Sequence, residues 1–202
     1  MKVLVESNAL IDLLDPRTPK SRSDRMKGLL QDIDKTNGTL VIPAQVVGEY
    51  IAGAGPAGQA ILAGLLRNRR IEVVSFDHVA ATECALMDRA AHATGNKRAP
   101  LGREALWQKV KVDRQIVALA RVHAVDLIVS SDEDILKIAK AVDIRCTAVK
   151  NLPLPGWAQQ VHIDEIAEPA RPRQVDRVKV LVEEEPVLRA VKRQPPEETG
   201  AI

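Results

Sequence analysis

The stretch VLVESNALIDLL, residues 3–14, decides the fold of this chain. The run at residues 2–5 lacks the polar alternation of a half-exposed strand, which is typical of a strand buried inside a parallel sheet. The strand then meets Glu6, Ser7 and Asn8, and Asn8 can cap a helix over residues 9–14. A carboxylate, a hydroxyl and an amide at this point indicate either a strand end followed by a helix cap or the first part of a metal site.

Outward from this stretch, apolar runs alternate with segments of helical period. Further strands are expected at residues 39–42, 71–75, 126–129 and 144–148, and helices at 21–35, 43–51, 58–69, 77–94, 104–123 and 133–141. Strands that are separated by helices throughout predict an α/β fold, a three-layer α/β/α sandwich around a central parallel sheet.

The composition changes toward the C-terminus. Residues 1–150 are expected to form one domain, and residues 151–168 a C-terminal extension of it. Residues 169–202 are rich in Pro, Glu, Lys and Arg, which predicts a charged, poorly structured and mobile tail. A segment that binds a partner or docks on the domain is the alternative for this tail.

Bulk composition excludes several classes of protein. Hydrophobic residues make up 46% of the chain, enough for a core, but no apolar run of about 18 residues predicts a membrane span. Glu6 comes too early for a secretory signal, and Cys84 and Cys146 lack paired metal spacing, so we expect a cytoplasmic protein with reduced core thiols. A redox role for the thiols is the less favoured alternative. Aromatic residues, at 2%, are too few for a base-stacking surface, so any nucleic acid must be held by its phosphates.

Acidic residues occur where a parallel sheet gathers its ligand sites, at the carboxyl ends of the strands. Glu6 ends the first strand and Asp132 follows the fourth, while Glu49 and Asp113 lie on helices that flank the same edge. Facing carboxylates repel one another unless a cation neutralises them, and oxygen ligands of this kind suit Mg²⁺ or Mn²⁺. Each acid also has an ordinary explanation as surface charge. Asp132 could simply cap the following helix, with Asp134 as the replacement ligand.

A basic stretch precedes the fourth strand. The sequence GNKRAPLGREALWQKVKVDR, residues 95–114, is the best candidate for an RNA track, because its cations can contact phosphates. The predicted RNA-binding residues are Lys97, Arg98, Arg103, Lys109, Lys111 and Arg114. A solvated helix face is the alternative.

Three segments, with their order and spacing, resemble the PIN domain over roughly residues 1–150: VLVESNALIDLL, IPAQVVGEY and VDRQIVALARVHAVDLIVSSDEDI. This fold family comprises metal-dependent ribonucleases, among them the VapC toxins of bacterial toxin–antitoxin pairs. The resemblance implies that the catalytic, metal-binding carboxylates are Glu6, Glu49, Asp113 and Asp132. It further implies that Ser7, Asn8 and Ser130 donate hydrogen bonds that orient these carboxylates.

The activity implied by this resemblance is hydrolysis of RNA phosphodiesters with Mg²⁺ or Mn²⁺ as cofactor. An antitoxin partner and a homodimer are implied in the same way. The family places Asp where Glu6 stands, and the extra methylene adds about 1.5 Å of reach. A catalytically silent PIN-like module that binds RNA or protein is therefore the alternative. A different enzyme on a doubly wound sheet is disfavoured, because no GxGxxG or P-loop motif follows a strand.

Overall fold

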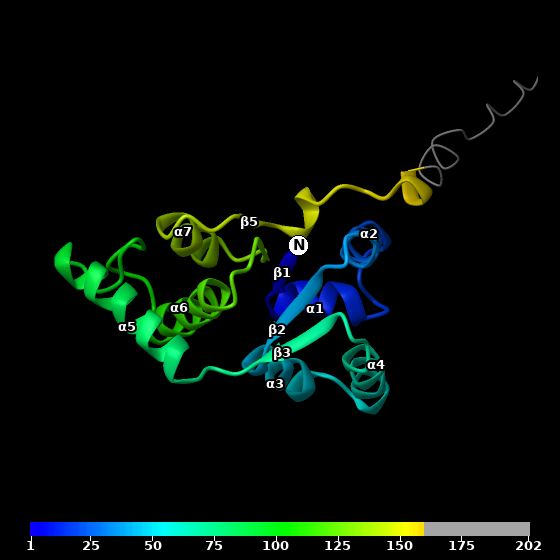
Figure 1. The fold of residues 1–202 in the computed structure, drawn as a ribbon, viewed down its shortest axis with the longest axis horizontal. Helices are drawn as coiled ribbons and strands as arrows, with labels where there is room; N and C mark the ends of the chain where they lie inside the picture. The colour runs from blue at the N-terminus through cyan, green and yellow to red at the C-terminus, as the bar shows by residue number, and fades with distance from the viewer. Residues whose placement is uncertain (160–202) are drawn as a thin grey trace, which may run out of the picture. The chain divides into compact units, whose positions relative to one another are not determined.

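The chain forms a five-stranded, all-parallel sheet in a computed structural model that describes residues 1–159. The predicted tail at 169–202 lies outside the described residues. The strand order is β3-β2-β1-β4-β5, which places β1 at the centre (Figure 1). The strands are β1 (Lys2–Val5), β2 (Thr39–Pro43), β3 (Ile71–Val74), β4 (Leu127–Val129) and β5 (Cys146–Thr147).

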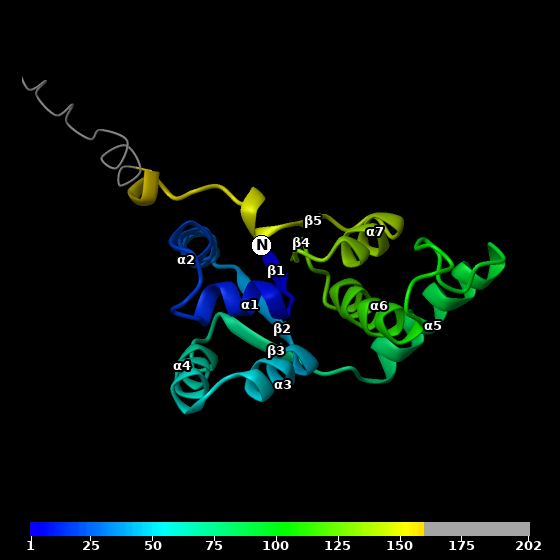
Figure 2. The ribbon, with the colours of Figure 1, turned by 180° about the vertical axis from the view of Figure 1, so that it is seen from behind.

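Helices cover both faces of the sheet, as Figures 1 and 2 show from opposite sides. One layer contains α1 (Ser7–Leu14), α2 (Lys20–Lys35), α3 (Ala44–Gly53) and α4 (Pro56–Leu66). The other contains α5 (His78–Ala93), α6 (Trp107–Val122) and α7 (Glu133–Ala141), and a short 3₁₀ helix, η1 (Val149–Asn151), follows β5. The predicted α/β/α sandwich with a central parallel sheet is confirmed.

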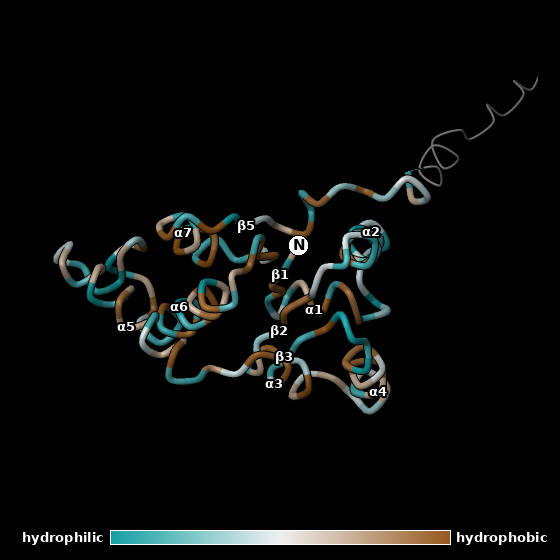
Figure 3. The backbone as a smooth tube through the Cα atoms, in the orientation of Figure 1, coloured by the Kyte–Doolittle hydropathy of each residue, from teal (hydrophilic) through white to brown (hydrophobic). Residues whose placement is uncertain are grey.

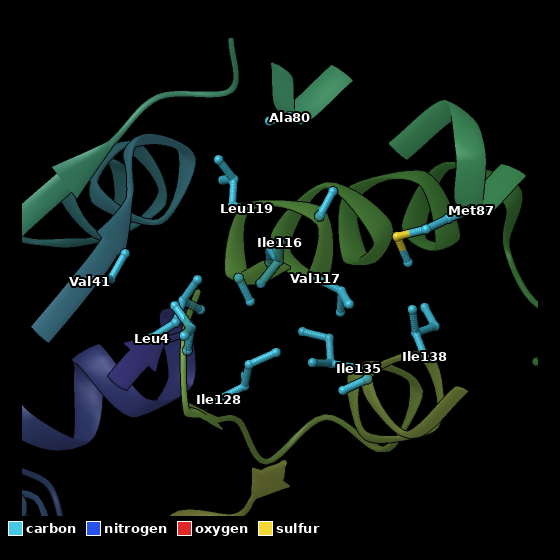
Figure 4. Close-up of a cluster of buried hydrophobic side chains, with 14 of the residues drawn as sticks. Leu4, Val41, Ala80, Met87, Ile116, Val117, Leu119, Ile128, Ile135 and Ile138 are labelled. Carbon is cyan, nitrogen blue, oxygen red and sulfur yellow. The ribbon is translucent and has the colours of Figure 1, made fainter. Parts of the chain in front are cut away.

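Two apolar clusters hold the layers together, and the central strand contributes to both. Val3 and Val5 pack with α1–α4, whereas Leu4 packs with α5–α7 (Figure 4). All three side chains are fully buried. Successive side chains of a strand point to opposite faces, so a strand covered on both faces must be apolar throughout. Figure 3 shows that α2, by contrast, is mostly hydrophilic, as expected of a helix with one face in water.

The first helix begins earlier than predicted. Glu6, not Asn8, is the N-cap residue of α1, and helical structure starts at Ser7. The assignment of Asn8 as the cap is therefore wrong. Asn8 lies in the first turn, where its amide Nδ2 donates a hydrogen bond back to Glu6 Oε1 at 3.4 Å. The helix predicted at 104–123, by contrast, begins later, at Trp107.

Beyond the sheet, the chain crosses α2. Leu152 and Ala158 are buried, and Trp157 Nε1 donates a hydrogen bond to Gln31 Oε1 at 3.1 Å. These contacts attach residues 152–159 to the α1–α4 layer. No helix of the described residues is long and apolar enough to cross a membrane.

Both cysteines are free thiols and are partly buried. Burial raises the pKa of the Cys146 thiol to about 11, so this side chain stays protonated at neutral pH. A protonated thiol is a poor nucleophile, which favours the structural role predicted for it over a redox role.

Candidate metal centre

The candidate site lies where the two central strands end. Register pairs Val5 with Val129, so the next residues, Glu6 and Ser130, emerge side by side at the carboxyl edge. The backbone N–H of Glu6 donates to the carbonyl of Val129 at 3.2 Å, and Ser130 Oγ donates to Glu6 Oε2 at 3.3 Å. Because β1 and β4 meet where the strand order reverses, this edge is the usual place for a ligand.

Glu6 is buried although it carries a carboxylate, with 8% of the residue exposed. Burial raises the pKa of Glu6, and the negative charges of Asp132 and Glu49 raise it further. Hydrogen bonds from Asn8 and Ser130 oppose this rise in pKa only in part. A nearby positive charge would stabilise the ionised form of this buried acid.

The tightest acidic group of the described residues comes from two helices. Asp113 of α6, with Asp132 and Asp134 at the start of α7, each offers a carboxylate oxygen, and these oxygens lie within 4.8 Å of one another. Asp132 is also the N-cap of α7, because its Oδ1 accepts a hydrogen bond from the N–H of Asp134 at 2.8 Å. The capping role and a place in the cluster therefore coexist. Asp134, predicted only as a replacement ligand, is a full member of this group.

Asp113 is the buried member of the acidic group. It is 5% exposed, and within residues 1–159 its Oδ2 is buried without a hydrogen bond. Burial raises the pKa of Asp113 to about 6; the charge of Lys109 lowers it and that of Asp132 raises it. A buried carboxylate oxygen without a hydrogen bond, in a group of three acids, fits a hard cation with oxygen ligands, such as Mg²⁺ or Mn²⁺.

Lys109 lies inside the acidic group and not along a separate RNA track. Its Nζ lies 3.0 Å from Asp132 Oδ2 and 3.4 Å from Asp113 Oδ2, and it is also ion-paired with Asp134. Burial lowers the pKa of Lys109, but hydrogen bonds to Asp134 and Asp132 outweigh it and raise the pKa overall. The sequence showed that Lys109 lies one helical turn before Asp113. Its contacts with Asp132 and Asp134 arise only because α7 packs beside α6.

Glu49 contributes from the other side of the site. It is exposed on α3, and Ser7 Oγ at the start of α1 donates a hydrogen bond to its carboxylate. The four predicted carboxylates are thus not equally close. Asp113 and Asp132 belong to the tight group. Glu6 lies beside it, hydrogen-bonded to Ser130, and Glu49 is hydrogen-bonded to Ser7. The charges of Asp132 and Glu49 both act on Glu6.

Ser130 links the central acid to the cluster. It is fully buried; its Oγ donates to Glu6 and accepts a hydrogen bond from the N–H of Asp132 at 3.0 Å. A serine in this place orients the Glu6 carboxylate and holds the backbone at Asp132.

Arg114 is removed from the predicted RNA track. It is 1% exposed; its guanidinium pairs with Asp88 and donates to the carbonyls of Lys97 at 2.8 Å and Ala99 at 2.7 Å. A buried group with these partners joins α6 to α5 and to the loop between them, and it is not free to bind a phosphate.

The remaining cations of the basic stretch are more accessible. Lys97 and Arg103 are exposed, and Arg98 and Lys111 are partly exposed. The Nζ atoms of Lys97 and Lys111 lie 4.9 and 5.9 Å from the centre of the Trp107 ring, which keeps both ammonium groups on one side of α6.

Two cations at this edge had no signal in the sequence. Arg22 and Lys150, with Ser131, line a cavity of about 290 Å³. Ser131 directly precedes Asp132, so this cavity adjoins the acidic group. Arg22 is also held by the buried Asp12, with 2.6 Å between Nη2 and Oδ2. Arg22 comes from α2 and Lys150 from the segment after β5, and only the fold brings these two cations together.

Comparison with known proteins gives a family match over most of the described chain. A model of the PIN domain matches residues 3–141. No curated protein sequence matches this chain.

Solved structures resemble this chain at low sequence identity. A chain in the VapBC2 structure from Rickettsia felis, bound to a DNA fragment from its promoter, has a TM-score of 0.50 and 14% identity. The match covers 73% of this chain and 98% of that chain. DNA-bound VapBC from Salmonella typhimurium follows with a TM-score of 0.48 and 18% identity, covering 74% of this chain and 98% of that chain. The first of these likenesses shows that the fold is shared.

Proposed function

The chain belongs to the PIN-domain family, and from that premise we propose that it is a divalent-metal-dependent endoribonuclease that hydrolyses RNA phosphodiesters. The observation that carries the proposal is the acidic group at the carboxyl edge of the sheet, in which a buried oxygen of Asp113 has no hydrogen bond within the described residues. Such a group is costly without a bound cation.

In this proposal Asp113, Asp132 and Asp134 hold one divalent ion, and Glu6 and Glu49 extend the site on its other side. The ion, Mg²⁺ or Mn²⁺, supplies an activated water and charge stabilisation at the phosphate. The chain itself positions the ligands. Ser130 orients Glu6 and holds the backbone at Asp132, Asn8 orients Glu6, and Ser7 orients Glu49.

RNA is proposed to approach along the accessible cations of the α5–α6 loop and α6, namely Lys97, Arg98, Arg103 and Lys111. Phosphate contacts of this kind provide affinity without reading the sequence. This explains how a protein with so few aromatic residues can hold RNA.

Loss of one such phosphate contact should change the salt dependence of RNA binding. Arg103→Gln is expected to weaken RNA binding and to reduce the slope of log affinity against log salt by about 1. Fluorescence anisotropy across a salt series measures both. Lys35→Gln, at the opposite edge of the sheet, serves as the control and should leave the slope unchanged. An unaltered slope in Arg103→Gln would remove this residue from the RNA track.

The solved Rickettsia felis structure is of VapBC2, and we propose a small antitoxin as the partner of this chain. We also propose a homodimer as its assembly state, which the family resemblance implies. The reading frame next to this gene should then encode a protein that co-purifies with the chain. Light scattering should give twice the chain mass. A lone monomer with no co-purifying neighbour contradicts both proposals.

The second candidate function is a catalytically silent PIN-like binding module. It is favoured by Glu6, whose side chain is longer than the Asp that the resemblance leads one to expect. Such a module would keep its affinity for RNA and show no cleavage with any divalent ion.

A metal titration separates the two functions. Purified full-length chain is expected to cleave structured RNA when Mg²⁺ or Mn²⁺ is added and to stop in excess EDTA. Gel analysis of end-labelled RNA follows the reaction. Cleavage that persists in EDTA contradicts the metal-nuclease proposal, and the absence of cleavage with either ion supports the silent module.

A further inference from the structure

The acidic group already contains a positive charge from the chain itself. The ammonium of Lys109 contacts Asp113, Asp132 and Asp134, the same three residues whose carboxylate oxygens lie within 4.8 Å of one another. One ammonium therefore lies among all three carboxylates of the proposed metal site.

The geometry of this contact depends on two helices. Lys109 precedes Asp113 by four residues on α6, so both side chains share one face of that helix. The N-terminus of α7 brings Asp132 and Asp134 to the same point. The Lys109 side chain is 40% exposed whereas that of Asp113 is 7% exposed. The ammonium thus reaches the group from the solvent side, and its flexible stem can withdraw without disturbing the core.

An ammonium and a divalent ion compete for these carboxylates. A Mg²⁺ ion binds its oxygen ligands at about 2.0–2.1 Å and would repel a positive charge held against the same carboxylates. The balance of charge also favours the divalent ion over the ammonium. One ammonium offsets only part of the negative charge of three acids. A divalent ion offsets more of it.

We infer that Lys109 is a resident counter-cation of the acidic group, which a divalent ion must displace in order to bind. The inference rests on the proposed function, since it assumes that this group binds the ion. Lys109 stabilises the metal-free fold and weakens the affinity for metal, so it sets the ion concentration at which the site fills. The displaced ammonium remains tethered beside the site by α6.

The test is Mn²⁺ binding by the full-length chain, measured by isothermal titration calorimetry without RNA. Lys109→Met removes the charge and keeps much of the aliphatic stem. It is expected to bind Mn²⁺ at least about tenfold more tightly than the wild type, which corresponds to about 1.4 kcal/mol. Lys140→Met is the matched control, because Lys140 is exposed in the last turn of α7 and is given no role in the site, and its affinity should stay within about twofold of the wild type.

Thermal unfolding provides an independent readout. In EDTA, Lys109→Met should unfold at a lower temperature than the wild type, and Mn²⁺ should raise its unfolding temperature by more. Lys109→Gln serves in the same way if the methionine variant does not fold.

Each outcome decides the inference. Tighter binding in the Lys109 variant, or binding in that variant alone, supports it. Equal or weaker binding in the variant, beside a wild type that binds Mn²⁺, overturns the inference and leaves the proposed function standing. If none of these proteins binds Mn²⁺, both are wrong.

Discussion

Replacing Asp113 by Asn is expected to lower Mn²⁺-dependent RNA cleavage by at least about 100-fold. Residues that only orient a metal ligand already cost about 10- to 100-fold when they are lost, and Asp113 is proposed to be a ligand itself. Its Oδ2 is buried and has no hydrogen bond within the described part of the chain. An amide in its place removes the negative charge and leaves the shape almost unchanged.

Cleavage rates at saturating RNA over a series of Mn²⁺ concentrations measure this effect. Glu133→Gln is the matched control, because Glu133 lies between Asp132 and Asp134 in the chain but is exposed and outside the acidic group. It should keep nearly wild-type activity. A rate for Asp113→Asn within a few-fold of wild type would falsify the assignment of Asp113 as a ligand.

The second large effect is on stability, and its direction is unusual. Asp113 titrates at about 6 in the folded chain, against an ordinary value of 3.8. The folded state therefore holds this proton more tightly than the unfolded state, so stability is full below about pH 4 and falls as the pH rises through 6. In EDTA this one residue is expected to cost about 3 kcal/mol of unfolding free energy by pH 7.5.

The measurement is a comparison with Asp113→Asn, which mimics the protonated acid at every pH. Urea unfolding in EDTA at pH 4 and pH 7.5 should show the wild type losing stability relative to the variant. The lowered pKa of Asp77 makes stability rise with pH instead, but this contribution is the same in the wild type and the variant. Added Mn²⁺ should restore the wild type at pH 7.5 and leave the variant unchanged. Parallel pH profiles in EDTA would show that Asp113 is already satisfied in the metal-free fold.

These two effects explain why an acidic group so costly to fold can persist. Without metal it destabilises the chain, and the ammonium of Lys109 offsets part of the repulsion. With metal the same charges become ligands. Stability and activity are thus linked through one set of carboxylates.

Much of the architecture was predictable from the sequence. Val3, Leu4 and Val5 are apolar in succession, which a strand requires only when helices cover both of its faces. That pattern and the spacing of the helices led to the α/β/α sandwich. The exact start of α1 was not predictable in the same way, because Glu6 and Asn8 are both acceptable near a helix N-terminus. The backbone distinguishes them, since Glu6 is extended and Asn8 lies within the helix.

For the site, the residue types at the carboxyl ends of the strands could be predicted, because strand ends follow from the local apolar pattern. How those residues meet depends on the packing of the helices. This packing moved Asp134 into the acidic group, placed Lys109 among the carboxylates, and buried Arg114 against Asp88. Each of these depends on the packing of α6 against α5 and α7, contacts between segments far apart in the chain that no local pattern encodes.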